Sequence, residues 1–237
     1  MSAPLPIVIL TGAGISAESG LATFRDKDGL WEGHRVEDVA CPDAFRRNPA
    51  LVHRFYNLRR AGLSGVEPNA AHFALARLQH EYPGEVTLIT QNVDDLHERA
   101  GSASVIHMHG ELRKVRCDLC WRGREWEGDL DTETVCPFCD RAGGMRPDIV
   151  WFGEIPKFME RIGKALDRAG IFAAIGTSGH VYPAAGFVGM AAAGGAETLE
   201  INNADTAVSS QFDRHLTGPA TVQVPVWVDE ILNRRGK

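Results

Sequence analysis

The sequence has 237 residues, of which 44% are apolar and 24% are charged, and its formal net charge is −6. A chain of this length buries a good core as one large domain or as one domain with a small module. The negative charge argues against nucleic acid as the main partner, and no stretch approaches the run of about 18 apolar residues that spans a membrane.

Residues 1–10 lack both a positively charged start and a small-residue cleavage site, so they indicate a first strand and not a signal peptide. Of the five cysteines, four form two close pairs and Cys41 stands alone. An odd count favours metal binding in a reducing compartment over disulfides. We therefore expect a cytoplasmic protein.

Short β-branched runs recur along the chain and predict strands at 7–10, 86–90, 105–108, 171–175, 198–201 and 221–224. Apolar residues at helical spacing predict helices at 70–79, 158–169 and 228–233. This alternation is typical of an α/β fold, in which helices cover both faces of a parallel sheet.

Two stretches interrupt the alternation. Residues 31–64 carry no good strand, and residues 113–145 contain the cysteine pairs and many turn-forming residues. We assign both stretches to a small inserted module. The large domain then consists of residues 1–30, 65–112 and 146–237.

Polar or small residues follow five of the predicted strands. These clusters begin at Thr11, Gln91, His109, Gly176 and Asn202. Ligands of parallel α/β sheets bind at the carboxyl ends of the strands. We expect the five clusters to converge on one crevice.

The first cluster, residues 12–17, matches the pattern G-x-G-x-x-G/A directly after a strand. Glycines there allow backbone N–H groups to approach a pyrophosphate, although a plain strand-to-helix turn would have the same pattern. A dehydrogenase would also need an acidic residue at the end of a second strand about 20 residues on. None is present, which argues against an oxidoreductase.

The pair Cys117 and Cys120 is separated by fifteen residues from the pair Cys136 and Cys139. Such spacing places four thiolates tetrahedrally around Zn²⁺. Cysteine fills all four positions, so the predicted zinc is structural. A nucleic-acid-binding zinc ribbon stays open as an alternative, because arginines and a lysine make this stretch locally basic.

Gln91, Asn92 and Asp94 offer two amides and a carboxylate, which suit a carboxamide such as that of nicotinamide. They also suit the N-cap of a following helix. A histidine at the crevice could take a proton from a hydroxyl. The pattern alone does not choose between His107 and His109.

Taken together, these motifs resemble the sirtuin family over essentially the whole chain. They occur in the sirtuin order at the cysteines and at residues 11–16, 24–25, 91–94, 109–110, 152–154, 176–178 and 201–202. The resemblance implies one sirtuin-type catalytic domain over 1–237, with a Rossmann-like large part and a small helical and zinc-ribbon part. It also implies that NAD is consumed as a co-substrate.

The resemblance implies roles for individual residues. The NAD site would be lined by Gly12, Ala13, Gly14, Ser16, Glu18, Phe24, Arg25, Trp31, Gln91, Asn92, Asp94, Gly176, Thr177, Ser178, Asn202 and Ala220. His109 would be the catalytic base. The substrate peptide would lie on Val150, Trp151, Phe152 and Gly153, partly by adding its backbone as a strand.

The implied activity is NAD-dependent removal of acyl groups from protein lysines, which yields nicotinamide, O-acyl-ADP-ribose and free lysine. The acyl oxygen would attack the ribose carbon as nicotinamide leaves, and His109 would then deprotonate a ribose hydroxyl. Two other readings stay open: an ADP-ribosyltransferase, and a non-enzymatic zinc-ribbon binding protein.

Tyr56 and Arg59 are three residues apart on a predicted helix and are therefore neighbours. A phenol hydroxyl beside a guanidinium offers hydrogen-bond donors that can bind a carboxylate together. A surface arginine near a half-buried tyrosine would have the same spacing in the sequence. Tyr-x-x-Arg resembles the pattern of bacterial class III sirtuins that prefer succinyl-, malonyl- or glutaryl-lysine. We expect acidic acyl groups to be favoured, with weaker deacetylation; a deacetylase without this preference is the alternative.

Overall fold

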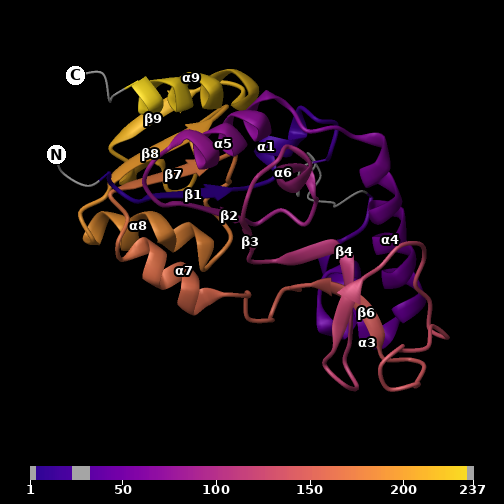
Figure 1. Ribbon diagram of the computed structural model, residues 1–237. Helices are drawn as coiled ribbons and strands as arrows, with labels where there is room; N and C mark the ends of the chain where they lie inside the picture. Colours follow the sequence, from indigo (N-terminus) through magenta and orange to yellow (C-terminus); the bar gives the residue numbers. More distant parts are fainter. Residues whose placement is uncertain (1–3, 23–32, 234–237) are drawn as a thin grey trace.

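The computed structural model describes residues 4–22 and 33–233. Its larger sheet is wholly parallel and has the strand order β3-β2-β1-β7-β8-β9 (Figure 1). Counted along the chain, this is the order 3-2-1-4-5-6 of a Rossmann sheet. The strands are β1 (Ile7–Thr11), β2 (Val86–Thr90), β3 (Val105–His107), β7 (Ile171–Ile175), β8 (Glu197–Asn202) and β9 (Arg214–Thr217).

Helices cover both faces of this sheet because alternate residues of each buried strand point to opposite faces. Ile7 and Ile9 of β1 pack under α5 (Ala70–Glu81) and α9 (Ala220–Asn233). Val8 and Leu10 pack against α7 (Met159–Leu166) and α8 (Phe187–Ala193). Figure 1 shows the two helix pairs on opposite sides of the sheet. The predicted α/β fold is confirmed.

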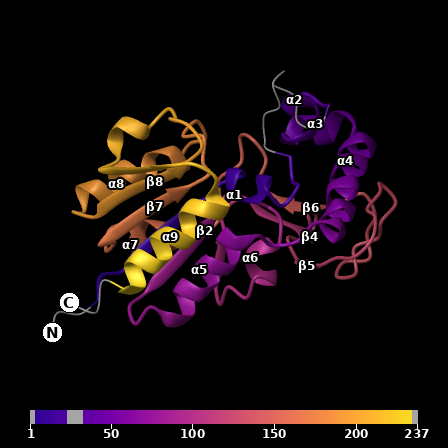
Figure 2. The same ribbon diagram turned by 90° about the horizontal axis from the view of Figure 1, so that it is seen from above.

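A second, antiparallel sheet has the order β5-β4-β6 and packs with a helical group. Figures 1 and 2 show this small part beside the large sheet, at the end where α1 (Gly14–Ala17) and α6 (Leu96–Arg99) lie. Its elements are α2 (Val36–Val39), α3 (Pro42–Arg47), α4 (Pro49–Gly62), β4 (Gly110–Cys117), β5 (Gly123–Glu125) and β6 (Met145–Ile149). Strands β4 and β6 straddle the expected boundaries near 112 and 146, and the division into two parts stays a prediction.

Local sequence explains why α3 and α4 are separate helices. The Cys41 sulfur accepts a hydrogen bond from the Ala44 N–H at 3.4 Å, and the Asn48 side chain accepts one from the Leu51 N–H at 3.1 Å. A proline follows each of these two N-cap residues. Proline suits the first helical turn, where its missing N–H leaves no bond unmade. Cys41 therefore serves as a cap.

The strand predicted at 221–224 is wrong, because these residues form the first turns of α9. Val224, Trp227 and Ile231 recur at helical spacing and are buried against the sheet and α5. The last strand of the sheet is β9, whose residues are half-buried or exposed and carried no apolar signal. In the described ranges, no helix is both long enough and apolar enough to cross a bilayer.

Candidate active site

The glycine turn lies at the carboxyl end of β1, where the strand order of the sheet reverses. Gly12 N–H donates to Ile175 O and Gly14 N–H donates to Gly176 O, both at 2.9 Å. A Cβ on Gly14 would stand 2.7 Å from the Gly176 Cα, so only glycine fits. Both N–H groups are thus used within the protein. Among the described residues, the Ala13 N–H between them has no backbone acceptor.

Three of the predicted polar residues form a buried cluster beneath the turn. The Asn92 amide donates to Gly12 O at 3.1 Å and to the Ser16 hydroxyl at 3.0 Å, and that hydroxyl donates to Asp94 at 3.1 Å. Burial raises the pKa of Asp94. Asp94 also accepts the Leu96 N–H at the start of α6, so the capping role and the cluster coexist.

A second buried network supports this cluster and was not predicted. The Thr11 hydroxyl donates to the Thr90 hydroxyl at 2.9 Å and lies 3.0 Å from the His97 Nε2. The Thr90 oxygen also accepts the Asn92 N–H at 3.0 Å. Thr11 and Thr90 end neighbouring strands in register. The polar residues at the ends of these two paired strands were the sequence signal from which this network could have been predicted.

His109 lies in the turn between β3 and β4 and is half-buried. Its Nδ1 is 3.1 Å from the Gln91 carbonyl oxygen. A carbonyl only accepts, so Nδ1 carries the proton and Nε2 keeps its lone pair. Burial lowers the pKa of His109 more than this hydrogen bond raises it, which favours the neutral ring.

His107 is the last residue of β3, whereas His109 lies beyond the end of that strand. The two side chains therefore have different surroundings. The His107 ring contacts the Glu98 carboxylate at 2.7 Å and the Asn92 carbonyl oxygen at 3.3 Å. Burial alone would lower the pKa of His107, but the hydrogen bond and charge of Glu98 raise it. The geometry thus separates an ion-paired histidine from a neutral one.

Other residues predicted to bind the cofactor lie around the ends of β7 and β8. The Asn202 amide donates to Thr177 O at 2.6 Å, and the Ser178 hydroxyl accepts the His180 N–H at 3.4 Å. The Glu18 carboxylate accepts the Thr221 N–H at 3.1 Å, at the start of α9 beside Ala220. Three other predicted cofactor residues lie outside the described residues, namely Phe24, Arg25 and Trp31.

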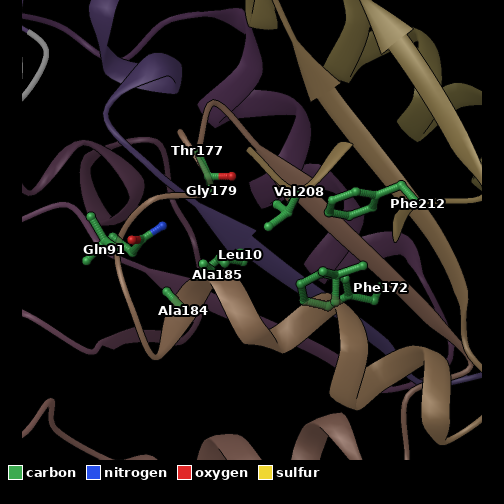
Figure 3. Close-up of a pocket in the computed structure, with 12 residues that line it drawn as sticks. Leu10, Gln91, Phe172, Thr177, Gly179, Ala184, Ala185, Val208 and Phe212 are labelled. Carbon is green, nitrogen blue, oxygen red and sulfur yellow. The ribbon is translucent and has the colours of Figure 1, made fainter. Parts of the chain in front are cut away.

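A cavity lies beneath the loop that follows β7 (Figure 3). The side chain of Gln91 lies at one end of this cavity, and Phe172 and Phe212 lie at the other. Thr177 also lines it, and the rest of the lining is mainly apolar. Gln91 therefore holds His109 through its backbone while its side chain faces this cavity.

Tyr56 and Arg59 lie on α4, with Tyr56 at 1% exposure and Arg59 half-buried. The Tyr56 hydroxyl accepts a hydrogen bond from the Trp151 indole N–H at 3.0 Å. Burial raises the pKa of Tyr56, and the nearby charges of Arg59 and Arg146 oppose this effect. Tyr56 is thus fully buried, and not half-buried as the alternative interpretation of this pair required.

The expected peptide segment, residues 150–153, connects the two parts of the fold. Val150 N–H donates to His109 O at 2.8 Å, and Phe152 N–H donates to Ala40 O at 2.9 Å. Trp151 N–H donates to the Glu154 carboxylate at 2.8 Å. These three N–H groups thus have partners within the protein, and the Trp151 carbonyl oxygen accepts the Glu154 N–H at 2.9 Å.

The four paired cysteines converge at one end of the small sheet, and all their sulfur atoms lie within 4.8 Å of one another. The Sγ atoms of Cys117 and Cys139 are 3.9 Å apart, and those of Cys120 and Cys136 are 3.7 Å apart. Four sulfurs at about 2.3 Å from a tetrahedral Zn²⁺ would be about 3.8 Å apart. The cluster therefore suits a structural zinc ion, as predicted.

Comparison with known proteins gives one consistent answer. Residues 12–183 match the Sir2 family. An NAD-dependent protein deacylase of Bdellovibrio bacteriovorus is 58% identical over 95% of this chain and 96% of its own. A mutant Sir2 homologue bound to ADP-ribose has a TM-score of 0.89 and 40% identity, and covers 97% of this chain and 93% of its own.

A further solved structure, a Sir2 homolog in complex with NAD, has a TM-score of 0.87 and 41% identity over 95% of this chain and 88% of its own. Both solved structures cover at least 95% of this chain, so the likeness extends over both of its sheets. The chain belongs to the Sir2 family of NAD-dependent protein deacylases.

Proposed function

We propose that this protein removes succinyl and malonyl groups from protein lysines in an NAD-dependent reaction, and acetyl groups more slowly. The products would be nicotinamide, O-acyl-ADP-ribose and free lysine. The observation that carries the acyl preference is the buried Tyr56 hydroxyl beside Arg59 on α4, bonded to Trp151 of the segment expected to hold the peptide. The thiolate ligands of zinc suit a reducing, cytoplasmic setting.

For the cofactor, we propose that NAD binds along the crevice at the ends of β1, β7 and β8. Ala13 N–H would meet a phosphate, and Asn92 and Asp94 would lie at the nicotinamide. Asp94 is buried, and its carboxyl oxygens could accept hydrogen bonds from the amide N–H groups of nicotinamide. Residues around Ser178, Asn202 and Ala220 would hold the adenosine half.

His109 is the proposed general base. The Gln91 carbonyl fixes the proton on Nδ1, so the free Nε2 would accept the proton of the reacting ribose hydroxyl. The backbone bond from Val150 N–H to His109 O ties this base to the proposed peptide segment. The same backbone hydrogen bond would therefore position both the base and the segment that holds the acyl-lysine.

The acyl preference has a physical basis in α4. A carboxylate on the acyl chain only accepts hydrogen bonds, and both a phenol hydroxyl and a guanidinium donate them. Arg59 also supplies a positive charge. An acetyl group offers nothing for either side chain, so it would bind without this contribution.

The test compares kcat/KM for succinyl-lysine and acetyl-lysine versions of one peptide in wild type and in Arg59→Met. Removing the charge partner should cost about 2–5 kcal/mol on the succinyl substrate only. Arg54→Met is the matched control, because Arg54 is an exposed arginine of the same helix that lines a separate outer groove. Equal losses on both peptides would show that Arg59 is structural and would remove the acyl preference.

A further inference from the structure

Trp151 and Tyr56 meet inside the small part, where one hydrogen bond joins the indole to the phenol. The Trp151 Nε1–H donates to the Tyr56 hydroxyl oxygen over 3.0 Å. The two side chains are 2% and 1% exposed, so water does not compete for this contact. The two rings are otherwise tilted, with centroids 6.3 Å apart.

This hydrogen bond has only one possible direction. An indole nitrogen only donates, whereas a phenol oxygen both accepts and donates. The Tyr56 oxygen is therefore the acceptor, and its own proton points away from the indole. Burial raises the pKa of Tyr56, so the phenol keeps that proton at neutral pH. Hydrogen bonds in a chain also polarise one another, which makes Tyr56 a better donor.

The indole is itself held rigidly. The Arg146 guanidinium carbon lies 3.3 Å from the Trp151 ring centroid, and Arg146 donates to both oxygens of Glu154 at 2.8 and 3.0 Å. Glu154 also accepts the Trp151 backbone N–H. The Phe45 ring contacts the indole with centroids 5.2 Å apart. These contacts hold the indole whose N–H the Tyr56 oxygen accepts.

We propose that Trp151 is a positioning residue for acyl specificity: its indole N–H fixes the Tyr56 hydroxyl as a donor toward the carboxylate of an acidic acyl group. The inference rests on the proposed function of Tyr56 and Arg59. A hydroxyl turned the other way would present its lone pairs to the carboxylate and repel it. An acetyl group carries no carboxylate, so its turnover does not depend on this orientation.

The experiment measures kcat/KM for the succinyl and acetyl peptides in Trp151→Phe, Tyr56→Phe and the double variant. A second replacement of Trp151 by benzothienylalanine exchanges only the N–H for sulfur and preserves the ring shape if phenylalanine impairs folding. We expect either change at 151 to lower the succinyl-to-acetyl ratio about tenfold, the effect of one charge-linked hydrogen bond. In the Tyr56→Phe background, the change at 151 should have no further effect on the ratio.

Trp227→Phe is the matched control, because Trp227 is an equally buried tryptophan on α9, in a different core cluster. Its ratio should stay at the wild-type value. An unchanged ratio in both position-151 variants, an equal loss on both peptides, or a fall that persists without the Tyr56 hydroxyl would each overturn the inference.

The Tyr56→Phe and Arg59→Met variants separate the two levels of the proposal. If they lower the ratio and the position-151 variants do not, the acyl preference stands and only the role of Trp151 is lost. If neither of them changes the ratio, the proposed acyl preference fails, and the inference fails with it.

Discussion

His107 and His109 lie two positions apart, yet their surroundings move their pKa values in opposite directions. His107 faces the Glu98 carboxylate and has a raised pKa. His109 is half-buried, its ring contacts the Gln91 carbonyl oxygen, and burial lowers its pKa. A base that works near neutral pH needs the second environment, because only an unprotonated ring accepts a proton.

The pH dependence of turnover follows from this difference. Because the pKa of His109 is lowered from 6.5, the acidic limb of log kcat/KM should have its midpoint below pH 6.5. Activity should rise with pH through that midpoint as the ring becomes neutral. Steady-state rates on an acetyl peptide, which does not titrate, measure it. His109→Ala should remove turnover, whereas a midpoint well above pH 6.5 would exclude His109 as the base.

Gly110 illustrates how strictly the backbone next to His109 is defined. It has a φ of +84°, and a Cβ there would lie 1.9 Å from the Asp148 carbonyl oxygen. Gly110→Ala should therefore lower the free energy of unfolding by about 3 kcal/mol or more, from strain and clash together. Urea unfolding measures this change.

Gly101→Ala is the control for Gly110→Ala. Gly101 has a similar φ of +92° but open space where a Cβ would be, so only the strain of about 1–2 kcal/mol remains. If both variants lose the same stability, the contact with Asp148 contributes nothing and the argument from close approach is wrong.

At the scale of elements, α5 carries a buried histidine that links stability to pH. His72 is fully buried, its Nδ1 accepts the Asn69 N–H at 3.3 Å, and burial lowers its pKa from 6.5 to about 4. The unfolded chain takes up this proton near pH 6.5 and the folded chain only near pH 4. The contribution of the neutral His72 ring to the free energy of unfolding is therefore complete above pH 6.5 and is lost as the pH falls toward 4.

We expect His72→Gln to weaken this pH dependence, because glutamine keeps an acceptor at the third helical position and does not titrate. Between about pH 7 and about pH 4.5, the wild type should lose about 2–3 kcal/mol more than the variant. Urea unfolding at the two pH values gives the comparison. Equal losses in the two proteins would mean that other groups cause the acid sensitivity.

The elements differ in how well sequence predicts them. The central strands and α5 were predicted because their apolar residues repeat with a clear period. The run 221–224 was mistaken for a strand because it is rich in valine and threonine, although Val224, Trp227 and Ile231 already had helical spacing. Strand β9 was not predicted, because its pairing with β8 holds it in the sheet and its own side chains show no apolar pattern.

The candidate site, too, was predicted from the sequence only in part. Short motifs indicated the glycine turn, the strand-end amides, His109 and the cysteines, because each lies within a few residues of sequence. The contacts of Thr11 with His97, and of Tyr56 with Trp151, join residues 86 and 95 positions apart. Such contacts arise only after the sheet has assembled, so no local pattern indicates them.

At the scale of the whole molecule, the zinc cluster should stabilise more than its own loop. Strand β4 connects Gly110 with Cys117 of the cluster, and β6 continues into the segment that begins at Val150. Cys136→Ser should lose the metal, lower Tm by roughly 10 °C or more, and lower kcat/KM on both peptides. Calorimetry and zinc analysis measure the outcome. Cys41→Ser, outside the cluster, should keep its zinc; a fully active, metal-free Cys136→Ser would contradict this role.

The position of β1 in the sheet has a consequence for synthesis of the chain. Ile7 in this first strand pairs with Val86 on one side and with Ile171 on the other. Strand β1 is therefore made before both of its partners, and one of its edges stays unpaired until residues 171–175 have been made. Unpaired apolar strands of this kind associate readily with other chains. We therefore expect chaperones to bind a nascent chain that stops before β7, because one edge of β1 is then unpaired.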